Sequence, residues 1–303
     1  MSAARGGNAP TAKAGVDRWA VVVETWLRMH TAAVYAFLYL PIVVVVLFSF
    51  NANRLATVWT GFSFNWYSVA LDDDVVISAL RNSFSVALPT AILSTLFGTM
   101  AALGMQRVGR RLRMGFDALT YISIIVPEIV IALSTLVMFA SSFVIINEHL
   151  GTKLQLGIPT IVAAHMLFNI SFVLLLVRAR LSGMDRTHVE ASFDLYATPW
   201  RTFRQITFPQ LTPAIIAGFL LSFTFSFDDY VITSFVSGPG SSTLPIFIFG
   251  QVKRGVTPET NAVATIMLAV TLAMLAVGQF LLSRASRNSG DQGTTMASMI
   301  AER

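Results

Sequence analysis

Two adjacent acidic residues, Asp228 and Asp229, lie inside a long apolar stretch, in the segment FSFDDYVITSF. An Asp near the centre of a membrane helix costs about 2.5–3.5 kcal/mol on insertion scales, so a position facing lipid is unfavourable. A carboxylate pairs well with an ammonium group, and the rings of Phe225 and Tyr230 can add cation–π attraction. These residue types are suited to contact with a positively charged group, and something must solvate or pair the two carboxylates.

Small and polar residues follow one side of the helix expected around this pair. At about 100° per residue they fall in a single stripe, which includes Gly218, Ser222, Ser226, Asp229, Thr233 and Ser237. Lipid offers no hydrogen-bond partner, so the stripe is expected to face a protein interface or a watery path, where Ser226 and Thr233 can accept hydrogen bonds. The alternative is a structural acid pair that bonds a partner subunit or backbone groups of a broken helix.

Three residues outside this helix have both a functional and a structural interpretation. Glu128 follows Pro127 in IIVPEIVIALS, where it either contacts substrate or is a packed structural acid. Trp66 is either an anchor at the membrane interface or a ligand contact. His165, inside an apolar helix, is expected to be a hydrogen-bonded core residue rather than a proton relay.

The elements that position these residues are membrane helices. Of 303 residues, 54% are hydrophobic and only 12% are charged, against roughly 25% charged in soluble domains. Six stretches approach or exceed the ~20 residues that cross a bilayer. The sequence therefore predicts an all-α, polytopic membrane protein with helices near 31–50, 77–104, 118–141, 158–178, 209–236 and 260–283.

The distribution of basic residues predicts the orientation of the chain. Sixteen of the 21 Lys and Arg residues lie in the N-terminal tail, in 105–116, in 178–208 and in the C-terminal tail, whereas the alternate loops carry four. By the positive-inside rule, we expect both termini to lie in the cytoplasm. The net charge of +5 reflects basic residues that orient the chain in the lipid bilayer. No nucleic-acid partner is predicted.

Several kinds of chemistry lack the residues they need. The chain has no Cys, and its four His are scattered, so no disulfide, metal site or cofactor site is predicted. No G-x-x-x-x-G-K-[ST] phosphate loop occurs, and no nucleophile accompanies the acids. We therefore predict a transport subunit rather than an enzyme, with any ATP hydrolysis on another chain.

The loop at 179–208 differs from the other connections because it mixes charged and apolar residues. Asp185 can cap a short helix that places Val189 and Phe193 on one side, and Pro199 allows a break before a second short turn. Such an amphipathic pair packs on itself, on a partner protein or on lipid headgroups.

At this loop the chain resembles the inner-membrane permeases of bacterial ABC importers, which carry E-A-A, three residues, Gly, nine residues and I-x-L-P. The spacing is retained, with Tyr196 in the Gly position. The matching residues are Glu190, Ala191, Ser192, Tyr196, Ile206, Phe208 and Pro209, and Asp194 lies between them. The resemblance implies that these residues form a coupling helix that docks on an ATPase. Tyr196 puts in doubt the tight backbone turn that Gly normally makes there.

Other segments look like the polyamine (spermidine/putrescine) permeases of the PotC and PotI type. They include GFSFNWYSVAL, VPEIVIALSTLVMF and LSFTFSFDDYVITSFVSGP. The resemblance implies a MetI-like five-helix core, 77–283, which contains the loop 179–208. A tail, 1–29, and an extra helix with a periplasmic loop, 30–76, precede this core, and a flexible tail, 284–303, follows it. It also implies three kinds of partner: a second homologous permease, two ATPase subunits and a periplasmic polyamine-binding protein.

Other functions remain as alternatives at this point. One is an ABC permease for another small cationic or amino compound. A secondary transporter would commonly show paired inverted repeats and interrupted helices in both halves, and none is evident. A membrane-embedded enzyme would use the carboxylates as acid and base.

Overall fold

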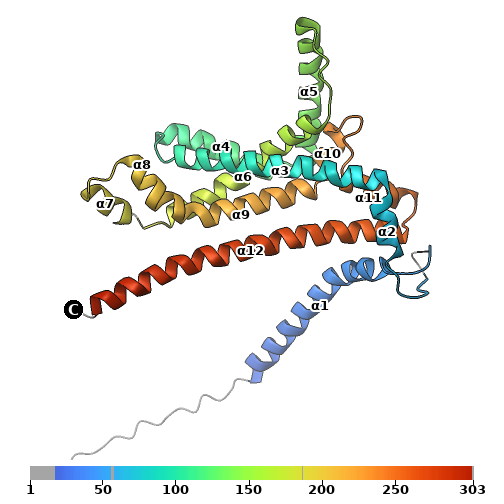
Figure 1. Cartoon of the computed structure of the whole chain (residues 1–303), viewed down its shortest axis with the longest axis horizontal. Helices are drawn as coiled ribbons and strands as arrows, with labels where there is room; N and C mark the ends of the chain where they lie inside the picture. The colour runs from blue at the N-terminus through green and yellow to red at the C-terminus, as the bar shows by residue number, and fades with distance from the viewer. Residues whose placement is uncertain (1–17, 56–57, 186, 302–303) are drawn as a thin grey trace, which may run out of the picture.

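The computed structural model describes residues 18–55, 58–185 and 187–301. Its described part is helical apart from turns, loops and one isolated β-bridge between Asn51 and Phe62. The long helices are α1 (Arg18–Phe48), α3 (Asp74–Gly104), α5 (Glu128–Leu150), α6 (Ile158–Ser182), α9 (Phe208–Phe227) and α12 (Pro258–Ala301). The shorter ones are α2 (Asn65–Asp72), α4 (Arg110–Ile125), α7 (Thr187–Asp194), α8 (Pro199–Thr202), α10 (Val231–Val236) and α11 (Leu244–Arg254). Figure 1 shows their arrangement.

Six helical stretches among the described residues are long and apolar enough to cross a membrane, which confirms the all-α, six-crossing prediction. The third crossing was misplaced. Residues 118–141 do not form one helix, because α4 ends at Ile125 and the spanning helix α5 begins at Glu128. Val126, before Pro127, has a ψ of 130°, the extended conformation that Pro imposes on the preceding residue.

The centre of the bundle is formed by α3, α6 and α9, which pack closely because small residues lie where they cross. Val173 of α6 is fully buried between two glycines. A Cβ added at Gly98 of α3 would lie 2.7 Å from the Val173 Cβ, and one added at Gly218 of α9 would lie 3.3 Å from its Cγ1. These glycines therefore set the distance between the three helices.

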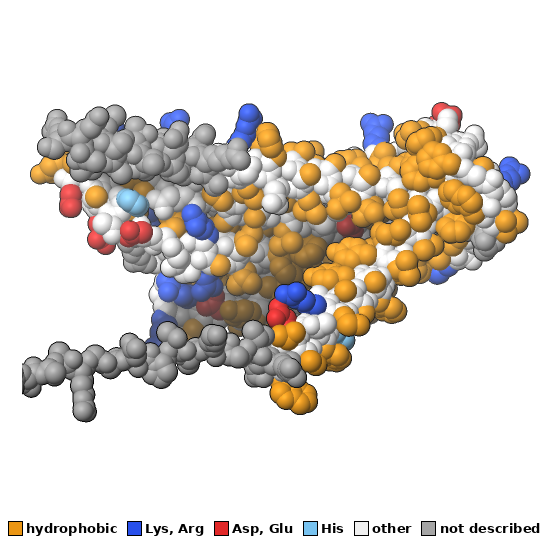
Figure 2. Space-filling model, turned by 90° about the horizontal axis from the view of Figure 1, so that it is seen from below, with side chains coloured by type: hydrophobic (Ala, Val, Ile, Leu, Met, Phe, Trp, Pro, Cys, Tyr) orange, Lys and Arg blue, Asp and Glu red, His pale blue; other side chains and the backbone are white. Residues whose placement is uncertain are grey.

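The remaining long helices lie at the periphery. In Figure 1, α5 stands at an angle to the central helices, and α1 and α12 run along one side of them. Their surfaces are largely exposed, and hydrophobic side chains cover most of the face seen in Figure 2. A surface of this composition suits contact with lipid or with other membrane helices.

The two ends of the chain differ in part from the sequence prediction. Helix α1 begins at Arg18, inside the predicted tail 1–29, and the residues before it lie outside the described part. Helix α12 continues to Ala301, where the sequence predicted a flexible tail over 284–303. The Ala and Ser residues in this segment are compatible with a helix.

Candidate functional site

The fifth crossing is broken at the acid pair, whereas the sequence predicted one continuous helix over 209–236. Helix α9 ends at Phe227 and α10 begins at Val231. The Asp229 side chain accepts hydrogen bonds from the first amides of α10: its Oδ1 from Ile232 N at 3.3 Å and its Oδ2 from Thr233 N at 2.7 Å. An Asp that satisfies free helix amides favours such a break over a continuous helix.

The same carboxylate is joined to α6 through His165, which is buried. His165 Nε2 lies 3.0 Å from Asp229 Oδ2, and its Nδ1 lies 2.7 Å from Ser226 Oγ. The Thr233 hydroxyl donates to Asp229 Oδ2 at 2.7 Å. The prediction that His165 is a hydrogen-bonded core residue is confirmed, and it links α6 to both sides of the break.

The polar stripe was expected to face a protein interface or a watery path, and in this subunit it lies at an interface between helices of the same chain. Ser226, Asp229 and Thr233 are at most 8% exposed, and their side chains form hydrogen bonds with one another and with His165. Gly218, in the same stripe, packs against Val173. The stripe is thus the surface on which α9 and α10 pack against α6, and Ser226 and Thr233 have a positioning role here.

Glu128 approaches this network from the other side. It is the first residue of α5 and is exposed on the isolated subunit. It lies beside Asp229 at a cavity of about 200 Å³, into which Phe225 of α9 also faces. The structure therefore brings together an exposed acid, a buried acid and an aromatic ring that the sequence singled out separately.

Two lining residues of this cavity, Phe168 and Asn169, were missed by the sequence analysis. Asn169 is 2% exposed, and its Nδ2 donates to the His165 carbonyl at 3.0 Å. The Phe168 ring packs 5.9 Å from the Phe225 ring. The available signal was the i, i+4 spacing of His165 and Asn169, which places two polar groups on one face of an otherwise apolar helix.

The other predicted path residues lie apart from the cavity. Asp228 is exposed, and its Oδ1 accepts a hydrogen bond from the Thr271 hydroxyl of α12 at 3.3 Å. The Tyr230 ring packs at a tilt against Phe249 of α11, with centroids 4.2 Å apart. Trp66 donates through Nε1 to the Asn51 carbonyl at 2.7 Å and so ties α2 to the loop that follows α1. The contact of Trp66 is structural in this subunit.

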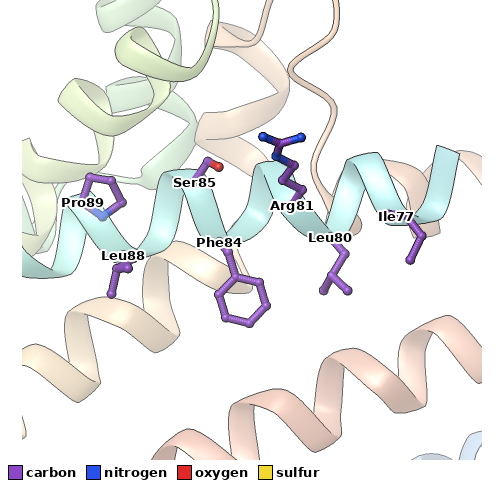
Figure 3. Close-up of a pocket in the computed structure, with 7 residues that line it drawn as sticks. All are labelled: Ile77, Leu80, Arg81, Phe84, Ser85, Leu88 and Pro89. Carbon is purple, nitrogen blue, oxygen red and sulfur yellow. The ribbon is translucent and has the colours of Figure 1, made fainter. Parts of the chain in front are cut away.

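A larger hollow of about 500 Å³ lies along α3, but its chemistry is unsuitable for a cation. All seven residues that line it belong to this one helix. Figure 3 shows Leu80 and Phe84 pointing to one side of α3 and Arg81 to the other. A fixed guanidinium at the rim repels an ammonium group, so the smaller acidic cavity is the better candidate for a cation.

The loop between α6 and α9 contains the predicted short helices. The Asp185 carboxylate accepts hydrogen bonds from Thr187 N at 2.9 Å and Thr187 Oγ1 at 2.6 Å, and these hold the pKa of the Asp185 carboxyl below its usual value. Helix α7 follows, α8 begins at Pro199, and a π-helical turn (η1) covers Phe203–Thr207 and includes Ile206. Pro209 lies in the first turn of α9.

The tight turn after α7 forms despite Tyr196 in the Gly position. Tyr196 has a φ of 58°, in the left-handed region, and Ala197 N donates to the Ser192 carbonyl at 3.0 Å, as in a Schellman motif. A side chain in this conformation costs roughly 1–2 kcal/mol. The doubt about the turn is thus removed, and Tyr196 projects from the loop with 96% of its surface exposed.

The loop holds its own shape through buried polar contacts and leaves its acids exposed. Ser192 occupies the position of the second Ala of the motif. Its hydroxyl lies 2.9 Å from Thr202 Oγ1, and this contact joins α7 to α8. Ala191 and Asp194 are exposed on α7. Glu190 is also exposed and lines a cavity of about 660 Å³ with Arg107 from the turn that follows α3. This arrangement presents a preformed, charged surface.

Comparison with known proteins identifies the family of this chain. Residues 94–287 match the family described as binding-protein-dependent transport system inner membrane component. The chain belongs to this permease family. It is 39% identical over 268 residues to the putrescine transport system permease protein PotI of Escherichia coli K12, covering 88% of this chain and 94% of PotI.

Further relatives have closely similar coverage. The spermidine/putrescine transport system permease protein PotC of Escherichia coli K12 is 37% identical over 260 residues, covering 86% of this chain and 95% of PotC. PotC of Haemophilus influenzae is 38% identical over 248 residues, covering 82% and 93% of the two chains. The permease is therefore a multi-pass inner-membrane transport subunit, as the sequence predicted, and not an enzyme.

Solved structures confirm the predicted MetI-like fold of ABC importer permeases. A chain of a bacterial ABC transporter involved in the import of the acidic polysaccharide alginate aligns with a TM-score of 0.72 at 13% identity, covering 88% of this chain and 98% of that chain. A chain of the MetNI methionine ABC transporter aligns with a TM-score of 0.54 at 15% identity, covering 70% of this chain and 99% of that chain. At these identities the likeness shows the fold alone.

Proposed function

We propose that this permease forms half of the membrane path of an ATP-driven importer for polyamines such as putrescine and spermidine. The observation that carries the proposal is the acidic, aromatic cavity at the break between α9 and α10, where Glu128 and Asp229 lie beside Phe225. Two carboxylates and an aromatic face suit an ammonium group. Likeness to PotI and PotC supports the same substrate class.

The proposed path divides the acids by role. Glu128 and Asp228 are exposed and available to a passing cation, whereas Asp229 mainly holds the break in shape and offers its less occupied Oδ1. Phe225 is 38% exposed at the cavity, and Tyr230 lies half-buried against Phe249. Affinity must remain moderate, because a conduit has to release what it binds.

The surface of the subunit supports a second homologous permease as partner. Helix α5 carries Glu128 at its first turn, is mostly apolar up to its last turn, and is largely exposed. A carboxylate in this position needs water or a polar partner, which lipid does not supply. A second permease against α5 would enclose the acidic cavity in a shared, hydrated path.

The remaining partners follow from the family and the loop. The name of the family implies a binding protein that delivers the substrate. We propose that this partner is a periplasmic polyamine-binding protein. We assign two ATPase subunits to the assembly, one for each permease, with α7 as the docking element. The distribution of basic residues supports a cytoplasmic location for this loop and for both termini.

Uptake of labelled putrescine and spermidine tests the proposed function. The permease, its partner permease, the ATPase and the binding protein are reconstituted in proteoliposomes with ATP inside. We expect accumulation of at least one of the two labelled polyamines that depends on ATP and on the binding protein. A complex that hydrolyses ATP when the binding protein is added, yet accumulates neither polyamine, contradicts the proposed substrate class.

Reversal of one charge in the loop tests the docking element. Glu190→Lys is expected to reduce uptake by at least about tenfold, because an interfacial charge meets a group of the same sign. ATP hydrolysis should no longer respond to the binding protein. Uptake and ATPase activity are measured on the same proteoliposomes.

Glu148→Lys is the matched control for this charge reversal. Glu148 is also exposed, but it lies near the end of α5, outside the loop. Its variant should keep coupled uptake. Normal uptake by the Glu190→Lys complex would remove α7 from the coupling path.

A further inference from the structure

Asn169, which lines the cavity beside the helix break, carries an unused hydrogen-bond acceptor, its Oδ1. This atom is buried and has no hydrogen-bond partner within the described part of the chain. Its identity as oxygen follows from geometry, because the other amide atom, Nδ2, donates to the His165 carbonyl at 3.0 Å. An unpaired buried acceptor is unfavourable unless a donor reaches it in another state of the protein.

The surroundings of Asn169 define the kind of donor that fits. Asn169 lines the same cavity of about 200 Å³ as Glu128, Asp229, Phe168 and Phe225. The two carboxylates favour a positive charge, and the two rings offer π faces. The group must therefore combine a positive charge with an N–H bond that a neutral carbonyl can accept.

The side-chain donors close to this cavity are already engaged. The His165 ring contacts Asp229 and Ser226, and the Thr233 hydroxyl donates to Asp229. No Lys or Arg lines this cavity. The acceptor is thus left for a molecule that enters the cavity.

We propose that Asn169 is a specificity-determining residue that accepts a hydrogen bond from a primary ammonium terminus of the substrate. This inference rests on the proposed polyamine function and adds to it a distinction between protonated amines and quaternary ammonium compounds. Both carry the charge that Glu128 and the rings favour. Only the protonated amine has an N–H bond for Asn169 Oδ1.

Equilibrium binding to the purified permease–ATPase complex, without the binding protein, tests this role. The ligands are labelled putrescine and, as competitor, its analogue with three methyl groups on each nitrogen. The wild-type complex should prefer putrescine. Asn169→Leu should weaken putrescine binding by about tenfold, the effect of losing one hydrogen bond to a charged group, and should affect the methylated analogue much less.

Two further variants separate recognition from packing. Asn169→Asp keeps an acceptor and adds a charge, so it should retain the preference for putrescine even where the Leu variant fails to assemble. Ser222→Ala is the packing control. It removes a buried hydroxyl that, like Asn169 Oδ1, lacks a partner among the described residues but lies outside the cavity, and this variant should bind putrescine as the wild type does.

Three results would overturn the role of Asn169. One is undiminished putrescine binding by Asn169→Leu, another is an equal loss for both ligands, and the third is loss of the preference in Asn169→Asp. Failure of the proposed function gives a different result. In that case the folded wild-type complex neither binds nor transports a polyamine.

Discussion

Replacement of Glu128 by Gln is expected to reduce polyamine uptake by at least about tenfold without loss of stability. Glu128 is exposed at the cavity, and a neutral amide cannot offset the charge of an ammonium group. The isolated subunit gives its carboxylate no ion pair within the described residues. Initial uptake rates of labelled putrescine, together with the thermal unfolding midpoint of the complex, measure both effects.

The matched control is Glu148→Gln, at the other end of the same helix. It changes the same chemical group in a position away from the cavity, so uptake should remain near the wild-type rate. If the Glu128→Gln and Glu148→Gln complexes transport equally well, Glu128 is not part of the cation path.

Replacement of Asp229 by Ala is expected to destabilise the subunit by about 3 kcal/mol or more. The Asp229 carboxylate accepts hydrogen bonds from two amides of α10 and from the Thr233 hydroxyl, and it contacts His165 Nε2. All of these groups are buried. Removal of the carboxylate leaves these buried groups without their acceptor. Denaturant-induced unfolding in mixed micelles, followed by intrinsic fluorescence, measures the change.

The neighbouring acid provides the comparison for this prediction. Asp228 accepts one long hydrogen bond, at 3.3 Å from Thr271, and its side chain is exposed. Asp228→Ala should therefore change stability by less than about 1 kcal/mol. Equal destabilisation by the two variants would show that Asp229 does not hold the break together.

The six crossings were predictable because bilayer thickness sets the length of each apolar run, and basic residues mark alternate loops. The break at Pro127 also has a local signal, since the residue before proline avoids the helical conformation. The exact position of the third helix was nevertheless missed, because hydrophobicity continues on both sides of that proline.

Periodicity alone could not predict which environment the acidic stripe faces. Small and polar residues line a water-filled path, but they are also what two membrane helices use where they pack closely. Gly218 was the residue that separated these cases, because its contact with Val173 marks a crossing of helices. That contact joins segments distant in sequence, so it became visible only in the structure.

The candidate site was predicted in part for the same reason. Glu128, Phe225 and Asp229 were recognised by residue type, and the structure places them around one cavity. Phe168 was missed because an isolated ring in an apolar helix carries no functional signal, and Asn169 was missed because its i, i+4 spacing to His165 is equally compatible with a structural pair. Their relevance comes from the residues that α5 and α9 bring beside them.

The most direct measurement uses the absence of cysteine from the chain. A single cysteine is placed at the cavity by Phe225→Cys, and its labelling by a cationic thiol reagent is followed in the assembled complex with and without putrescine. The matched variant Ser68→Cys carries its thiol on an exposed position of α2. The account predicts that putrescine slows labelling at position 225 and leaves position 68 unchanged. Labelling at position 225 that saturating putrescine does not slow would contradict a polyamine path through this cavity.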